Sequence, residues 1–256
     1  MTQLSLCFAP NDAGRTILTE RRAGYPYSVT APIRQPGGMA QLTLQSISGG
    51  LYGGERLAQH ITLRQGAHAR LIQPAATTVR RSAKASPAAR QSIILEAEGG
   101  ARLVYASRPL IMLPGSALHQ NWDILLSPGA RIMFWDGFVS HSPNGEVPDW
   151  SLTSRMSART REGKLLAAER MVVKGASLGA GFQGATQTFG AFGKFWCLGA
   201  PPGQIEHRVL PQGLETAATG ITSLPAGAGF TIALAADTGG ALSSAMERIL
   251  AWLEEV

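Results

Sequence analysis

Stretches of alternating apolar and polar residues recur along the chain, and they predict β-strands. The alternation is clear in residues 57–63 (LAQHITL) and again over residues 151–174. Successive side chains of a strand point to opposite faces, so a period of two indicates strands with one buried face. A turn at 161–164 divides the second stretch, which we interpret as a hairpin with one basic face. One side of its first strand carries Leu152, Ser154, Met156 and Ala158.

A strand, a turn built on glycine and alanine, and a returning strand recur together along the chain. The copies cover residues 61–71, 94–104 and 124–134, with a weaker one at 224–232. Glycine supplies the backbone conformation that other residues resist in such turns. Because the copies are unevenly spaced, we expect irregular stacked and coiled β-hairpin sheets, β-helix-like, rather than a strict solenoid. The predicted fold class is therefore mainly β.

A glycine-rich bend lies between two of the predicted strands. Gly49-Gly50 and Gly53-Gly54 bracket Leu51 and Tyr52, within the stretch SGGLYGGERL that leads into residues 57–63. Two glycine pairs this close indicate a place where backbone approaches backbone, or where φ is positive.

About two helices are expected, one of them at the C-terminus. Residues 241–254 repeat apolar side chains at helical spacing, namely Leu242, Ala245, Met246, Ile249, Leu250 and Leu253. This pattern predicts an amphipathic helix packed on the sheet. A second, short helix is expected over residues 183–192. We interpret residues 1–256 as one β-rich domain.

Composition narrows the class of partner. The chain has 256 residues, a net charge of +6 and 45% hydrophobic residues. A net positive charge is typical of a soluble protein with a basic surface, or of a protein whose surface meets an acidic partner. Nucleic acid is not expected, because no Lys/Arg run alternates with aromatic residues. Cys7 and Cys197 show no metal-binding or disulfide spacing, and no secretory signal or membrane span is visible, so a cytoplasmic location is expected.

Three motifs in one order give the chain a family resemblance. GGLYGGERL, GAHARLIQPAATTVRRS and ILLSPGARIMFWDG resemble the urease accessory proteins called UreD, or UreH in some bacteria. The resemblance implies a β-rich fold of coiled sheets with two helices and no enzymatic activity. It implies a scaffold or chaperone that binds the urease apoprotein and a UreF-type accessory protein, and through the latter a UreG-type GTPase. Nickel would be in transit to the urease active site through a water-filled passage, with no cofactor tightly bound.

The resemblance also suggests passage residues: Glu55, Asp136, Glu146 and Glu169, with His141 as a weaker candidate between Asp136 and Glu146. Nickel(II) accepts carboxylates, imidazoles and water, and single acidic groups would hold it weakly. The other interpretation of each carboxylate is a turn cap or a surface ion pair. The loop at 138–144 lacks the Gly-Arg that is common in the family.

Two other functions remain open from the residues alone. A β-rich carbohydrate- or ligand-binding module would show a cluster of exposed tryptophans on one sheet face. The five tryptophans show no such spacing. A metal hydrolase would need three close ligands and an open position, and no H-x-H or H-x-x-x-H pair occurs.

Overall fold

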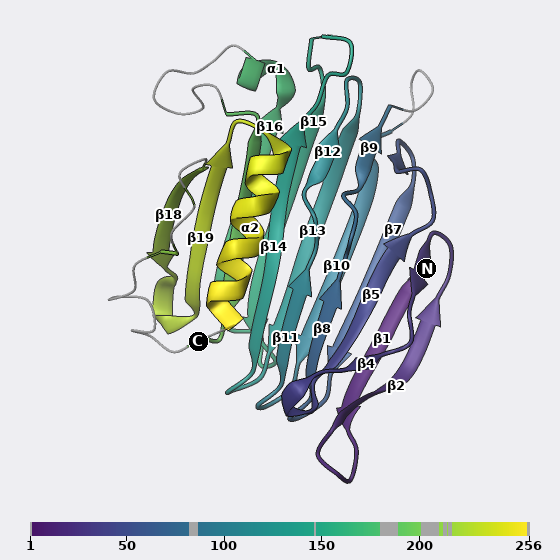
Figure 1. Ribbon diagram of the computed structural model, residues 1–256, viewed down its shortest axis with the longest axis vertical. Helices are drawn as coiled ribbons and strands as arrows, with labels where there is room; N and C mark the ends of the chain where they lie inside the picture. The colour runs from purple at the N-terminus through teal and green to yellow at the C-terminus, as the bar shows by residue number, and fades with distance from the viewer. Residues whose placement is uncertain are drawn as a thin grey trace.

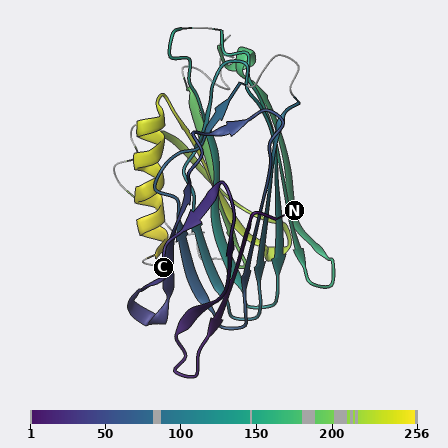
Figure 2. The same ribbon diagram turned by 90° about the vertical axis from the view of Figure 1, so that its right-hand side faces the viewer.

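Two β-sheets are stacked face to face, and one long helix covers the outer face of the larger sheet (Figures 1 and 2). The computed structural model describes residues 2–81, 87–145, 147–179, 189–200, 210–211, 214 and 217–254. The seven-stranded sheet has the order β16-β15-β13-β10-β7-β1-β2. Its strands are β1 (Leu4–Pro10), β2 (Thr16–Ala23), β7 (Arg56–Leu63), β10 (Ala89–Ala97), β13 (Ala117–Leu126), β15 (Ser151–Thr160) and β16 (Leu165–Lys174).

The twelve-stranded sheet follows the order β18-β19-β17-β14-β11-β8-β5-β3, with four short strands beside this path. The main strands are β3 (Tyr27–Val29), β5 (Ala40–Ser46), β8 (His68–Ile72), β11 (Arg102–Ala106), β14 (Arg131–Ser140), β17 (Ala191–Leu198), β18 (Ala217–Ser223) and β19 (Gly229–Ala236). The short ones are β4 (Ile33–Arg34), β6 (Leu51–Tyr52), β9 (Thr78–Arg80) and β12 (Leu110–Met112). The helices are α1 (Gly175–Gly179) and α2 (Gly239–Glu254), with 3-10 turns at Pro36–Gly38 and Pro225–Gly227.

The Gly-Ala repeats form the stacked part of the fold, and the mainly β, β-helix-like class is confirmed. Their turns hold Gly66, Gly100 and Gly129 at φ of +70°, +70° and +74°. Each turn joins a strand of one sheet to a strand of the other, as in β7 to β8, β10 to β11 and β13 to β14. The strands pair in parallel with their equivalents in the next copy.

The prediction that these three copies are hairpins is therefore wrong in one respect, because the two strands of a copy do not hydrogen-bond to each other. Alternation shows that a strand has one buried face, but it does not show which strand receives its hydrogen bonds. Here both strands of a copy bury their apolar faces against each other across the sandwich. The hairpin predicted at residues 151–174 is confirmed, since β15 and β16 pair antiparallel, and the weaker fourth copy is also a hairpin, formed by β18 and β19.

The glycine-rich bend brings two backbones together. Gly50 has a φ of +145°, and a Cβ at this position would lie 2.4 Å from the carbonyl oxygen of Thr78. Gly54 has a φ of +86°. The bend thereby lets β6 pair with β9, as the paired glycines indicate.

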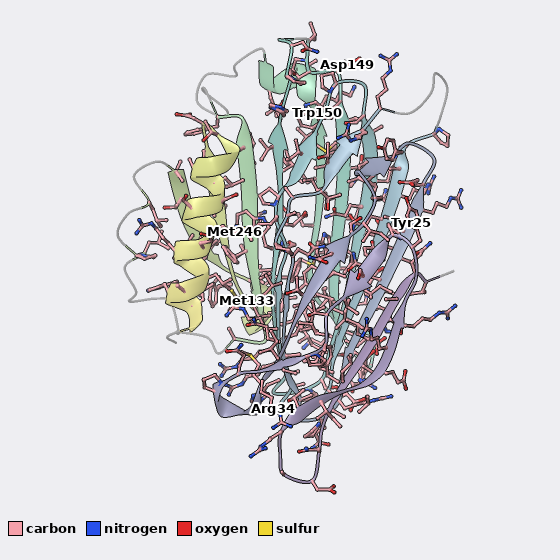
Figure 3. All side chains as sticks on the ribbon, turned by 45° about the vertical axis from the view of Figure 1, so that its right-hand side comes forward. Tyr25, Arg34, Met133, Asp149, Trp150 and Met246 are labelled. Carbon is pink, nitrogen blue, oxygen red and sulfur yellow. The ribbon has the colours of Figure 1, made fainter. Side chains whose placement is uncertain are left out.

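The core has two parts, one between the sheets and one beneath α2. The second part includes Ile232 of β19 with Leu242, Met246 and Ile249 of the helix, and Met133 of β14 packs against it (Figure 3). The C-terminal helix predicted at 241–254 is present, and the hydroxyl of Thr238 accepts a hydrogen bond from the Ala241 N–H at its start. No helix among the described residues is long and apolar enough to cross a membrane.

Most of the short helix suggested at 183–192 lies outside the described residues. The end of that segment, from Ala191, belongs to β17. The shorter of the two described helices, α1, lies just before this segment.

Candidate functional site

A row of polar side chains crosses the apolar interior of the sandwich. Gln91 of β10, Gln120 of β13 and Ser154 of β15 are aligned in register on three neighbouring strands. On β13 and β15 they occupy inward positions that are otherwise apolar, such as those of Leu118 and Leu152. Burying such groups is unfavourable unless they are hydrogen-bonded, so their partners identify what the row is built around.

Asp136 of β14 is the charged group at this row. Its Oδ1 accepts a hydrogen bond from Gln120 Nε2 at 2.7 Å, and its Oδ2 accepts one from Ser154 Oγ at 2.9 Å. Both donors belong to the opposite sheet, so the carboxylate bridges the sandwich interior. Burial between the sheets raises the pKa of Asp136 above its ordinary value, while these two hydrogen bonds oppose the shift.

An ion pair completes the polar site. Lys194 of β17 lies directly across from Asp136 in the β14–β17 register. Its ammonium pairs with the Oε1 of Glu169 on β16, and it lies 5.2 Å from the centre of the Trp196 ring. The charge of Glu169 also raises the pKa of Asp136, whereas that of Lys194 lowers it. The three groups therefore form one coupled electrostatic unit.

Cavities lie on both sides of Asp136. The larger has a volume of about 180 Å³, and its wall includes Ser154, Glu169, Met171 and Lys194. The smaller has a volume of about 20 Å³. A cavity needs roughly 10–15 Å³ to hold one water and two to four polar partners to keep it. The smaller cavity meets this size, and the buried indole N–H groups of Trp122 and Trp135 in its wall have no hydrogen-bond partner among the described residues.

The smaller cavity leads to a second polar cluster. The Tyr105 hydroxyl in its wall donates to Gln59 Oε1 at 2.8 Å, and Gln59 Nε2 donates to the Tyr27 hydroxyl at 3.0 Å. Burial raises the pKa of Tyr27 to about 12, and the charge of Glu55 adds to this shift. The polar layer, by which we mean these two clusters with the cavities between them, extends from Tyr27 to Lys194.

The suggested passage residues divide between this layer and the surface. Asp136 and Glu169 line the larger cavity together. Glu55 acts electrostatically on the far end of the layer, but its Oε2 accepts a hydrogen bond from the Tyr52 N–H at 2.8 Å, as a turn cap does. His141 is exposed in the loop after β14, roughly 16 Å along the chain from Asp136 at the rise of a strand. Glu146 lies outside the described residues.

The resemblance did not suggest the donors Gln120 and Gln59, or Lys194. The sequence carries a signal for Gln120 and Gln59, because each is a polar residue at an apolar position of an alternating strand. Gln120, for example, lies between Leu118 and Trp122 in the inward-facing set. Lys194 has no comparable signal in a glycine-rich strand. Among the described residues, no group of three His, Cys, Asp or Glu side chains could hold a metal ion, so this part of the chain offers single carboxylates and no closed cage.

Comparison with known proteins places the chain in a family. The family model described as UreD urease accessory protein matches residues 1–256. The chain is 35% identical to urease accessory protein UreD 1 of Methylorubrum populi, over 96% of this chain and 85% of that protein. It is 31% identical to urease accessory protein UreD 1 of Pseudomonas syringae pv. syringae, over 96% of this chain and 88% of that protein. The chain belongs to the UreD family of urease accessory proteins.

Proposed function

We propose that this protein is a non-enzymatic urease maturation factor that assists delivery of nickel into the urease active site. In this role it binds the urease apoprotein and a UreF-type accessory protein, and meets a UreG-type GTPase through the latter. Family membership supports the role in urease maturation. The polar layer inside the sandwich supports transit of a cation.

The observation that carries the proposal is the pair of cavities that flank Asp136. A hydrated divalent cation is stabilised by negative charge in an environment that otherwise excludes it. Asp136 and Glu169 supply that charge in the wall of the larger cavity. Because the described residues place two carboxylates here and no third metal-binding side chain beside them, binding would be weak and release fast, as transit requires.

Lys194 gives the site its resting charge balance. Its ammonium neutralises Glu169, so this partly buried carboxylate is not left unpaired. An arriving cation would take the place of this ammonium beside Glu169, and Lys194 would return when the cation leaves. The raised pKa of Asp136 makes a proton compete with the cation for that carboxylate, which further limits retention.

The ligand-binding module is not favoured. Trp122, Trp135, Trp150 and Trp196 are buried, and Trp252 lies on α2, partly buried against the helix core. The described tryptophans therefore form no exposed platform of the kind that stacks on a sugar.

The proposal is tested by expressing the urease structural subunits and the other accessory proteins with and without this chain, carrying an affinity tag. We expect the tagged chain to co-purify with the urease apoprotein and with the UreF-type protein, and the urease formed without it to lack nickel and activity. A urease that gains its full nickel content without this chain would contradict the proposal.

A further inference from the structure

The outer face of the seven-stranded sheet is open among the described elements. The long helix α2 packs on β17, β18 and β19 of the other sheet, on the far side of the molecule (Figure 2). Alternation and burial identify the outward side chains. On β10, for example, Ala89 is buried and Gln91 lines an internal cavity, so Arg90 between them points outward and is exposed.

Five exposed cations gather across one half of this face. We call them the basic stripe, and they are Arg56, Arg90, Arg155, Arg170 and Lys174. Two pairs are direct neighbours in register: Arg56 with Arg90, and Arg155 with Arg170. In the part of the chain that the structure describes, none of the five forms an ion pair. The outward positions between them hold small or uncharged polar residues, valine and His119, and no Asp or Glu.

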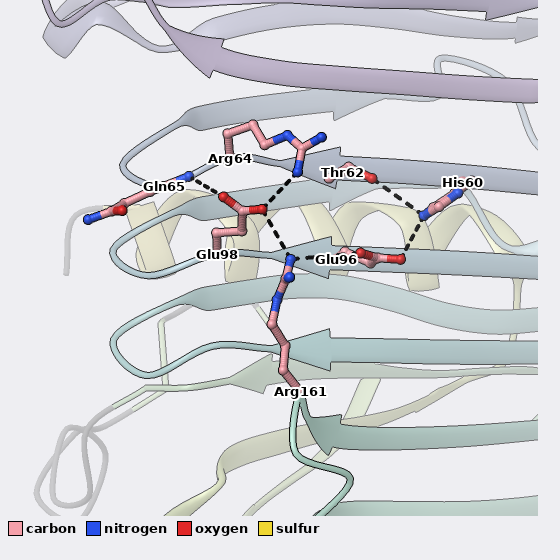
Figure 4. A network of polar contacts seen from close by, with 7 residues as sticks. All are labelled: His60, Thr62, Arg64, Gln65, Glu96, Glu98 and Arg161. Carbon is pink, nitrogen blue, oxygen red and sulfur yellow. Dashed lines mark hydrogen bonds and ion pairs between the residues drawn. The ribbon is translucent and has the colours of Figure 1, made fainter.

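This arrangement is unfavourable for the isolated fold. Like charges directly opposite each other in an antiparallel pair destabilise the sheet, and Arg155 lies directly opposite Arg170. The other end of the same sheet is balanced instead. There Glu98 pairs with Arg64 at 2.9 Å and with Arg161 at 3.2 Å, and Glu96 pairs with His60 at 2.8 Å (Figure 4). Carboxylates thus offset neighbouring cations at that end, whereas no carboxylate of the described residues lies among the cations of the stripe.

We propose that the basic stripe is a docking site for the acidic surface of a folded partner protein. The inference rests on the proposed function, in that the partner is one of the proteins with which this chain matures urease. From β7 to β16 the stripe crosses four strand spacings, or roughly 19 Å. A face of small side chains with arginines on it fits a complementary acidic surface, which would remove the repulsion within the stripe.

A nucleic acid fits this face less well. Proteins that bind single strands place aromatic side chains among their cations for base stacking, and the outward positions of the stripe carry no Phe, Tyr or Trp. Asp123, Glu96 and Glu98 lie further along the same face or at its end, where an extended polyanion would meet their charges.

The test compares a stripe variant with a matched control. The stripe variant is Arg90→Glu with Arg155→Glu, and the control is Arg34→Glu with Arg102→Glu, which changes the net charge equally. Both control residues are exposed and belong to strands of the other sheet, and Figure 3 shows Arg34 at the end opposite Trp150. Binding is measured to the purified urease apoprotein and to the purified UreF-type protein, at low and at high salt.

We expect the parent and the control to bind alike, and the stripe variant to bind one of the two partners about tenfold more weakly at low salt, with a smaller salt dependence. Unchanged binding of the stripe variant to both partners would overturn the docking site and leave the proposed function intact. Equal weakening of binding by the control variant would also overturn it. So would a result in which the stripe variant binds both proteins as the parent does and loses only its binding to a labelled single-stranded oligonucleotide. Failure of the parent to bind either partner would overturn both proposals.

A stability measurement separates docking from a structural role. Arg155→Glu alone places opposite charges across the β15–β16 pair, so its melting temperature should equal or exceed that of the parent while its binding is weakened. A melting temperature several degrees lower would show that Arg155 serves the fold, and would overturn its role in docking.

Discussion

Asp136 and Gln120 lie on opposite sheets, and the Asp136 carboxylate accepts a 2.7 Å hydrogen bond from the Gln120 amide across the sandwich interior. Both side chains occupy inward positions between large apolar neighbours, Phe134 and Phe138 on one sheet and Leu118 and Trp122 on the other. A core built only for stability would place apolar groups there. The contact therefore fixes a carboxylate where the fold itself gains little from one.

The first prediction concerns the pH dependence of stability at Asp136. Because its pKa is raised in the folded protein, ionisation costs stability as the pH rises from the unfolded value, about 3.9 for aspartate, through the folded value. Asp136→Asn cannot ionise and keeps an acceptor for Gln120. The variant should melt above the parent at neutral pH, and the difference should vanish below about pH 3.9. Thermal melts across this pH range measure the difference between variant and parent. A variant whose stability relative to the parent is lower at neutral pH than in acid would contradict the raised pKa.

A second prediction concerns the ion pair of Lys194 and Glu169. Lys194→Met leaves a partly buried carboxylate unpaired and removes the charge that lowers the pKa of Asp136. We expect a loss of about 1–2 kcal/mol at neutral pH, between the values typical of surface and of buried pairs.

The control for this variant is Lys194→Met combined with Glu169→Gln, measured by denaturant unfolding as a double-mutant cycle. Removing both charges should recover most of the stability. If the double variant is no more stable than Lys194→Met alone, the effect comes from lost packing on Trp196 and not from the unpaired charge.

The glycine-rich bend allows a prediction with a control one residue away. Gly50→Ala forces a side chain into a φ of +145° and against the Thr78 carbonyl, and should cost about 2 kcal/mol or more. At Gly49 the nearest atom to an added Cβ is the Tyr52 hydroxyl oxygen at 3.4 Å, so Gly49→Ala should change stability by about 0.5 kcal/mol or less. Equal effects on the midpoint of urea unfolding would show that the bend is not constrained as described.

Ser154 and Ser151 lie on one strand, and only the first donates a hydrogen bond to Asp136. Ser154→Ala removes that bond and should destabilise the protein by about 1 kcal/mol. Ser151 is exposed, and Ser151→Ala should be close to neutral. A neutral Ser154→Ala would indicate that Gln120 alone satisfies the carboxylate.

The sequence predicts the turns of this fold better than its pairing. The predicted turns at Gly66, Gly100 and Gly129 are correct because positive φ is a local requirement that glycine meets. The partner of each strand is a matter of the whole chain, since a strand after a tight turn can pair with the strand before it or lie on the facing sheet. Here the hydrogen bonds go to the next copy, and no residue in the turn specifies this.

The candidate site shows the same division. Alternation places Ser154 in an apolar set, and the resemblance suggests Asp136 and Glu169. No pattern along the chain joins these residues to Lys194, which belongs to the strand paired with β14. The pairing decides which charges meet, so the ion pair follows only from the fold.

The most direct test of the polar layer is the nickel content of urease formed with Asp136→Asn in place of the parent chain, with Ser151→Ala as the matched control. Nickel per urease active site is measured in purified enzyme, and co-purification of the variant with the urease apoprotein is measured beside it. If Asp136 assists transit, the Asp136→Asn variant binds the apoprotein as the parent does, and urease contains several-fold less nickel, while the control matches the parent. Nickel content equal to that of the parent, with binding intact, would contradict a role for Asp136 in the route.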